Sequence, residues 1–136
     1  MRKPKAARPT SESMKILELA FTGYPVTDMK RARAFYEGIL KLEPTRTFEN
    51  PNGEWIEYDV GPSTFALSNM SREEWKPSSD GPAVAFEIDD FDSAVGALRA
   101  SNVKFVLEPF ESPVCRTFII ADPDGNSIAI HKRHVR

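Results

Sequence analysis

Three side chains carry groups that could take part in acid–base or nucleophilic chemistry. They are the carboxylate of Glu57, the imidazole of His131 and the thiol of Cys115. A carboxylate buried beside apolar groups has a raised pKa, which would suit a general base, and an imidazole titrates near neutral pH. Cys115 lacks an evident neighbouring base, so we interpret it as an inert thiol. Glu57 and His131 are therefore the candidate catalytic residues.

Both candidates also have a purely structural explanation. His131 stands beside Lys132, Arg133 and His134 near the end of the sequence, where a solvated histidine is ordinary. Glu57 could be an outward strand residue or the partner of a nearby arginine. Both interpretations stay open at the level of sequence.

The elements that must position these residues occur twice. The segments "FTGYPVTDMKRARAFYEGIL" (21–40) and "AVAFEIDDFDSAVGALRASN" (83–102) align without a gap at an offset of 62, the difference between 83 and 21. Each begins with the period-2 alternation of a strand. A helix follows, starting at Thr27 or Asp28 in the first copy and at Asp89 or Asp90 in the second.

Each helix is followed by three predicted strands. The segments 44–49 and 103–108 are short strands, and the segments 53–69 and 115–133 are hairpins around the turns "VGPS" and "DPDGN". The sequence thus predicts an α+β fold of two β-α-β-β-β units. Unit one covers 15–69, a linker rich in Pro, Ser and Gly covers 70–82, and unit two covers 83–133. Residues 1–14 are predicted to be a flexible basic tail of this single domain.

Two β-α-β-β-β units, the "FY" on the first helix and the "DPDGN" hairpin resemble the vicinal oxygen chelate superfamily, the glyoxalase, bleomycin-resistance and extradiol dioxygenase group. The resemblance covers about residues 16–132. It implies that the two units form a curved mixed sheet, with the helices outside and a concave ligand cleft inside. It also implies a divalent metal in many members.

The positions that hold this metal in related proteins are apolar here. By the resemblance, the ligands would stand at Phe21, Ala66, Ala83 and Ala129. Phenyl and methyl groups have no lone pairs for a metal ion, so we predict no metal and no cofactor. A non-standard site, for example His131 with Glu57, is the alternative.

A small-molecule ligand is predicted to occupy the vacated cleft. Strand alternation places Trp55 and Glu57 on the same face of their strand, and Ala129 and His131 on the same face of theirs. The ligand-binding residues that we predict are Phe21, Trp55, Ala66, Ala83, Cys115 and Ala129. They form a mostly apolar cup, which is typical of small-molecule sites. Trp75 either covers this cup or fixes the linker.

Composition excludes several other classes of protein. The net charge of −2 gives no basic field for nucleic acid, and no apolar run is long enough to span a membrane. A single cysteine permits no internal disulfide, which together with the absence of a secretory signal favours the cytoplasm. Two complete units permit a monomer, and we expect a homodimer.

Three functions are compatible with the sequence. The first is a metal-free protein of the bleomycin-resistance type that binds a small, largely apolar or aromatic molecule. The second is a metal-independent lyase or isomerase that uses Glu57 or His131. The third is a non-catalytic protein-interaction module, in which the cleft has become core.

Overall fold

The chain is built from two copies of one succession of elements, and the computed structural model describes residues 14–70 and 73–134. The first copy consists of β1 (Thr22–Pro25), α1 (Met29–Arg33), η2 (Ala34–Ile39), β2 (Pro44–Asn50), β3 (Gly53–Val60) and β4 (Ser63–Ser68). The second consists of β5 (Val84–Glu87), α2 (Phe91–Ala100), β6 (Phe105–Glu111), β7 (Cys115–Ala121) and β8 (Ser127–Arg133). The predicted basic tail lies outside the described residues except for Met14.

Both helices begin at an aspartate. The carboxylate of Asp28 accepts a hydrogen bond from the Arg31 amide at 3.1 Å, and that of Asp90 accepts one from the Ser93 amide at 3.1 Å. These bonds satisfy amide groups that the first turn of a helix leaves free. The sequence left Thr27 or Asp28 and Asp89 or Asp90 as candidates. The structure uses Asp28 and Asp90, which are 62 positions apart, the offset of the repeat.

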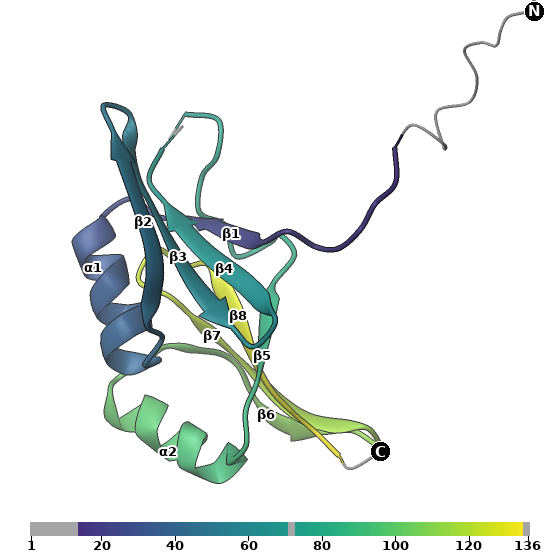
Figure 1. Cartoon of the computed structure of the whole chain (residues 1–136). Coiled ribbons are helices and arrows are strands. Elements are labelled where there is room, and N and C mark those ends of the chain that lie inside the picture. The colour runs from purple at the N-terminus through teal and green to yellow at the C-terminus, as the bar shows by residue number, and fades with distance from the viewer. Residues whose placement is uncertain (1–13, 71–72, 135–136) are drawn as a thin grey trace, which may run out of the picture.

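Each copy forms its own four-stranded mixed sheet (Figure 1). The strand orders are β1-β4-β3-β2 and β5-β8-β7-β6, and the first pair of each sheet is parallel. Gly23 lies opposite Ala66 in the first sheet, and Ala85 lies opposite Ala129 in the second. The α+β class is confirmed. Each unit contributes one of the two sheets, and no strand pairing joins them in the described part of the chain.

The side chain of Tyr24 separates the two sheets where their edge strands meet. Its hydroxyl accepts a hydrogen bond from the Val84 amide at 2.6 Å and donates one to the Ser127 carbonyl at 2.6 Å. The Val84 amide at the start of β5 therefore donates to the side chain of Tyr24 on β1, and not to a backbone carbonyl of β1. This is a physical reason why the two sheets do not pair edge to edge.

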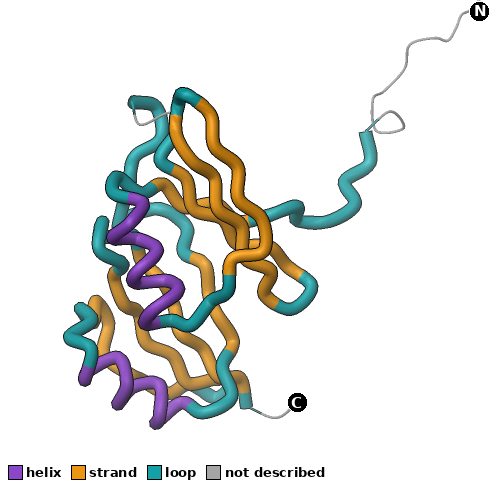
Figure 2. The backbone as a smooth tube through the Cα atoms, turned by 60° about the vertical axis from the view of Figure 1, so that its left-hand side comes forward, coloured by secondary structure: helices purple, strands orange, loops and turns teal. Residues whose placement is uncertain are grey.

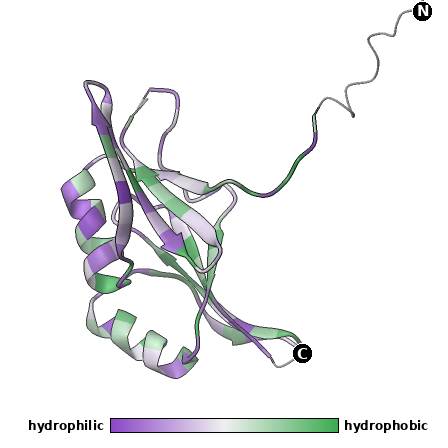
Figure 3. Cartoon of the chain, in the orientation of Figure 1, coloured by the Kyte–Doolittle hydropathy of each residue, from purple (hydrophilic) through white to green (hydrophobic). Residues whose placement is uncertain are grey.

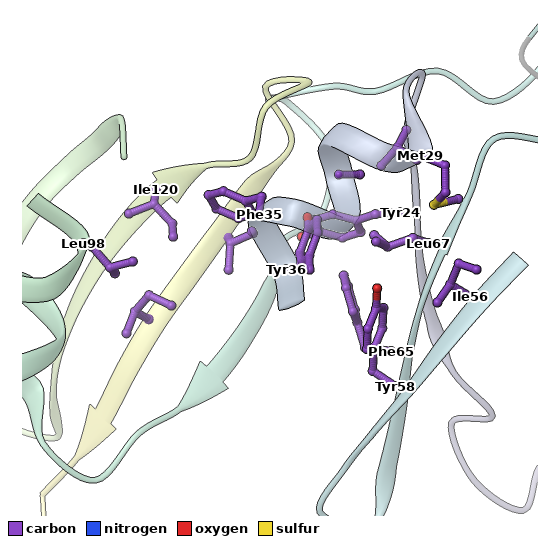
Figure 4. Packing of buried hydrophobic residues seen from close by; sticks show 14 of the residues in the cluster. Tyr24, Met29, Phe35, Tyr36, Ile56, Tyr58, Phe65, Leu67, Leu98 and Ile120 are labelled. Carbon is purple, nitrogen blue, oxygen red and sulfur yellow. The ribbon is translucent and has the colours of Figure 1, made fainter. Parts of the chain in front are cut away.

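The helices cover one face of the sheets, and the core lies between (Figure 2). Alternate side chains of β3, β7 and β8 are buried, and both helices carry hydrophilic as well as hydrophobic residues (Figure 3). The largest fully buried core side chains are Tyr36, Tyr58, Phe65, Phe118, Ile56, Leu67, Ile120 and Ile128. Figure 4 shows Tyr36 and Phe65 packed together beneath the first helix.

No helix in the described residues is long and apolar enough to cross a membrane.

The turn between β7 and β8 connects unit two to unit one. The buried carboxylate of Asp122 accepts hydrogen bonds from the Tyr36 hydroxyl at 2.7 Å and from the Asn126 amide and side chain, each at 2.9 Å. Asp124 accepts one from the Thr27 hydroxyl at 2.5 Å. The "DPDGN" segment is therefore a hairpin turn, as predicted, and also the main polar contact between the two units.

Candidate ligand-binding site

Three aromatic rings gather on the face of the first sheet that points away from α1. Phe21 precedes β1, Trp55 lies on β3 and Trp75 belongs to the segment between the units. The ring centroids of Phe21 and Trp55 are 5.1 Å apart in an edge-to-face arrangement, and those of Trp55 and Trp75 are 6.5 Å apart. We refer to these three residues as the aromatic cluster. Trp75 packs on the sheet beside two of the predicted ligand-binding residues.

Small residues make room for this cluster. A Cβ atom on Gly23 would lie 3.2 Å from Cη2 of Trp75 and 3.4 Å from Cε1 of Phe21, so a larger residue would require the Trp75 ring to shift by a few tenths of an ångström. Ala66 lies opposite Gly23 and is fully buried. Its methyl group is on the predicted face of the strand, but it is covered.

Phe48 extends the same face, and the sequence analysis did not identify it. It lies on β2 directly opposite Trp55, and 55% of its surface is exposed. In sequence an isolated phenylalanine on an otherwise polar strand carries no signal. Its register against Trp55 is what brings it beside the aromatic cluster.

Glu57 is an ion-paired carboxylate beside the cluster. It pairs with Arg46 on β2, and it accepts a hydrogen bond from Nε1 of Trp55 at 2.8 Å. The bonds from Arg46 and then Trp55 stabilise the charged form, so they hold the pKa of Glu57 below its usual value. Partial burial acts to raise this pKa, but the two bonds outweigh it, so the raised pKa that would suit a general base is not found. The arrangement matches the arginine-partner explanation left open by the sequence.

His131 forms a pair with Glu87 on the second sheet. Nδ1 of His131 lies 2.5 Å from Oε1 of Glu87, and the Arg133 amide donates to Oε2 of Glu87 at 2.7 Å. Partial desolvation raises the pKa of Glu87, but the bonds from Arg133 and His131 outweigh it and lower the pKa overall. Glu87 was missed because a glutamate on the outer face of a strand is typical of ordinary solvated surface.

A cavity of about 470 Å³ lies where the two units meet, and Glu87 is part of its wall. The other walls are the edge of β5 around Ala85 and the turn between β3 and β4, including Thr64 and Phe65. Phe65 and Phe86 touch beside it, with ring centroids 5.5 Å apart. This cavity is a second concave region, and no predicted site residue lines it.

The remaining predicted residues belong to unit two. Ala129 is half-buried opposite Ala85, and Ala83 is exposed just before β5. Cys115 is half-buried beside the Ser112 hydroxyl, whose oxygen is 3.5 Å from Sγ. The predicted cup is thus distributed over two sheets. Among the described residues, no hydrogen bond or ring contact links the aromatic cluster to His131.

The residues at the expected metal positions do not fit a metal ion. Phe21, Ala66, Ala83 and Ala129 offer no oxygen, nitrogen or sulfur donor. The alternative pair, His131 and Glu57, is divided between the two sheets, and each side chain is bonded to another partner. No group of three or more potential ligand side chains occurs in residues 14–70 and 73–134.

Comparison with known proteins decides the family. The family model of the Glyoxalase/Bleomycin resistance protein/Dioxygenase superfamily matches residues 18–130, most of the chain. The chain belongs to this superfamily. The boundaries of the match include both units, and the resemblance inferred from the repeat and the "DPDGN" hairpin is confirmed.

Individual members of the superfamily differ in function. The chain is 26% identical over 121 residues to lactoylglutathione lyase of Haemophilus influenzae, covering 82% of this chain and 90% of that protein. It resembles the fold of TnmS3, an antibiotic-binding protein from Streptomyces sp. CB03234, with a TM-score of 0.75, 22% identity, and coverage of 89% and 99%. Glyoxalase I of Leishmania major gives a TM-score of 0.70, 22% identity, and coverage of 86% and 87%. Both an enzyme and a binding protein thus share this fold.

Proposed function

We propose that this superfamily member binds a small, largely apolar or aromatic molecule against the aromatic cluster, without a divalent metal. The observation that carries the proposal is the mutual contact of Phe21, Trp55 and Trp75 on the helix-free face of the first sheet. Phe21 remains 49% exposed there, so ring surface is open to a ligand. The chain also resembles the fold of an antibiotic-binding protein, which supports a function in binding a small molecule.

The polar groups beside the cluster favour an uncharged ligand surface. The indole N–H of Trp55 is already bonded to Glu57, and the carboxylates of Glu57 and Asp59 both pair with Arg46. A ligand at this face therefore meets ring faces and edges, and it need not satisfy a buried polar group. Edge-to-face and offset ring contacts add about 0.5–1.5 kcal/mol each to the burial of apolar area.

Tryptophan fluorescence tests this proposal, because the chain has two tryptophans and both belong to the cluster. Titration with N-phenyl-1-naphthylamine, an uncharged aromatic compound, is expected to change the emission saturably. The same compound at 100 times its Kd should stabilise the fold by about 2.7 kcal/mol. Trp75→Leu and Phe21→Ala should each weaken binding at least tenfold, while Phe110→Ala on the second sheet should not. Equal affinity in all three variants would refute the proposal.

The metal-independent lyase or isomerase is the second candidate, and the Glu87–His131 pair favours it. A carboxylate that orients an imidazole, with the carboxylate in the wall of a cavity, is an arrangement suited to proton transfer. A test substrate is the hemithioacetal of methylglyoxal and glutathione. Turnover that is lost in His131→Ala, reduced in Glu87→Gln and retained in Glu57→Gln would support this candidate.

We further propose that the protein acts in the cytoplasm as a homodimer.

A further inference from the structure

A pocket of about 260 Å³ lies between the end of the first helix and α2. Both helices lie on the same face of the sheets (Figure 2), which is the face opposite the aromatic cluster. We call this space the interhelix pocket. Three of its wall residues come from the end of η2 and the turn after it, and three come from α2: Ile39, Leu40, Leu42, Ala94, Ala97 and Leu98.

The repeat explains why the core is open at this place. On the first helix Phe35 and Tyr36 are both buried, and their rings pack edge to face with centroids 5.1 Å apart. The positions of α2 at the offset of 62 are Ala97 and Leu98. Leu98 is buried, but Ala97 carries only a methyl group and is exposed. Unit two therefore lacks the aromatic ring that Phe35 supplies to unit one.

The wall of the interhelix pocket is apolar apart from one side chain. Phe86 and Ile88, at the end of β5, line it and pack against the core. Glu87 is the one charged residue in this wall among the described residues. Its carboxylate already has two partners, Nδ1 of His131 and the Arg133 amide. Because no carboxylate oxygen is left without a partner, the pocket favours an uncharged molecule.

The volume of the pocket fits one aromatic ring. An engineered cavity of about 150 Å³ that is lined by Leu, Ile and Phe stays free of water and binds benzene. Sites for drug-sized ligands are larger, with volumes of about 300–1,000 Å³. The interhelix pocket, at about 260 Å³, lies between these sizes. It therefore suits a single ring with a short substituent.

We propose that the interhelix pocket binds an uncharged single-ring aromatic molecule, whose ring takes the place that Phe35 fills in unit one. This site is separate from the regions described above. The aromatic cluster lies on the other face of the first sheet. The larger cavity shares Val60, Phe86 and Glu87 with the pocket, but no helix residue lines it. The proposal therefore goes beyond the proposed function, and it holds whether or not the aromatic cluster binds a ligand.

Methyl nuclear magnetic resonance with toluene as the probe tests this site in the full chain. Toluene is expected to shift the ¹³C-labelled methyl signals of Ile39, Ile88 and Leu98 saturably with one Kd. Phe21→Ala should leave this Kd unchanged, because Phe21 lies on the other face, so the outcome separates from that of the fluorescence titration. Benzoate has the same ring with a charge and should bind at least tenfold more weakly. Methyl signals that do not move saturably, or benzoate that binds as tightly as toluene, would overturn the proposal.

Substitution of Ala97 tests whether the missing ring creates the site. Ala97→Phe supplies a ring from the chain itself and should raise the Kd of toluene at least tenfold. Ala97→Leu fills less of the pocket and should raise the Kd by a smaller factor, which keeps the test decisive if the larger side chain disturbs α2. Gly96→Ala is the matched control, because a Cβ atom at this neighbouring exposed position meets nothing within 4 Å, and it should bind toluene like the wild type. An unchanged Kd in both Ala97 variants, or an equal loss in Gly96→Ala, would contradict the proposal.

Discussion

At the scale of single residues, Gly23 decides how closely Trp75 can approach the sheet. Gly23→Val adds carbon atoms where Cη2 of Trp75 is 3.2 Å from the first of them, so the ring must move away. We expect a red-shifted tryptophan emission and ligand binding about tenfold weaker, which corresponds to about 1.4 kcal/mol. An unchanged emission spectrum would mean that Trp75 does not rest on Gly23.

Gly96 is the matched control. It is exposed in the middle of α2, and a Cβ atom there would meet nothing within 4 Å. Gly96→Ala should stabilise the protein by about 0.5–1 kcal/mol, because glycine is a poor helix former. Urea denaturation measures this gain, and ligand binding should not change. A loss of stability would show that α2 tolerates no side chain at this position.

Glu57 gives the aromatic cluster a response to acid. A carboxyl group whose pKa is lower in the folded state stabilises the fold above its unfolded value, and this contribution is lost as the pH falls through the folded pKa. Protonation of Glu57 also weakens its bond from Nε1 of Trp55. We expect a change of tryptophan emission with a midpoint below pH 4.5, the ordinary pKa of glutamate, that is absent in Glu57→Gln. The same transition in the variant would assign it to another group.

At the scale of elements, the turn between β7 and β8 holds the two units together through Asp122. Asp122→Ala leaves the buried hydroxyl of Tyr36 and the side-chain amide of Asn126 without this acceptor. Each such loss costs about 1–3 kcal/mol, so we expect a destabilisation of about 3 kcal/mol or more. Tyr36→Phe removes one donor and should cost less, about 1–2 kcal/mol. Urea denaturation ranks the two, and the reverse order would refute this role of Asp122.

Local patterns in the sequence predicted most elements. The helix starts at Asp28 and Asp90 and the two hairpins are observed. Their signals lie within a few residues of the chain. The contact of Asp122 with Tyr36 joins residues 86 positions apart, and no local pattern encodes it.

The candidate site was predicted less well for the same reason. Trp55 and Glu57 were placed on one face because strand alternation requires it. Trp75 lies in a segment without periodicity, and Phe48 and Glu87 gain their meaning only from strands that pair with theirs. Sequence patterns therefore define faces of strands, whereas the partners across a sheet come from the folded structure.

At the scale of the whole molecule, the duplication separates two candidate regions. The first sheet carries the aromatic cluster, and the junction with the second sheet carries the cavity beside Glu87. The four positions where the superfamily resemblance implies metal ligands are apolar in both units alike. We therefore interpret the chain as a superfamily member that binds a small apolar or aromatic molecule at the aromatic cluster. The competing hypothesis is an enzyme that transfers a proton through Glu87 and His131.

Nuclear magnetic resonance of the two indole N–H groups separates these accounts most directly. N-Phenyl-1-naphthylamine, an uncharged aromatic compound, is added to ¹⁵N-labelled protein, and the indole signals of Trp55 and Trp75 are followed together with the backbone amides of Ala85 and Glu87. The proposed function predicts that both indole signals shift saturably with one Kd, while the amides at the cavity stay in place. Saturable shifts at Ala85 and Glu87 with unmoved indole signals would contradict it.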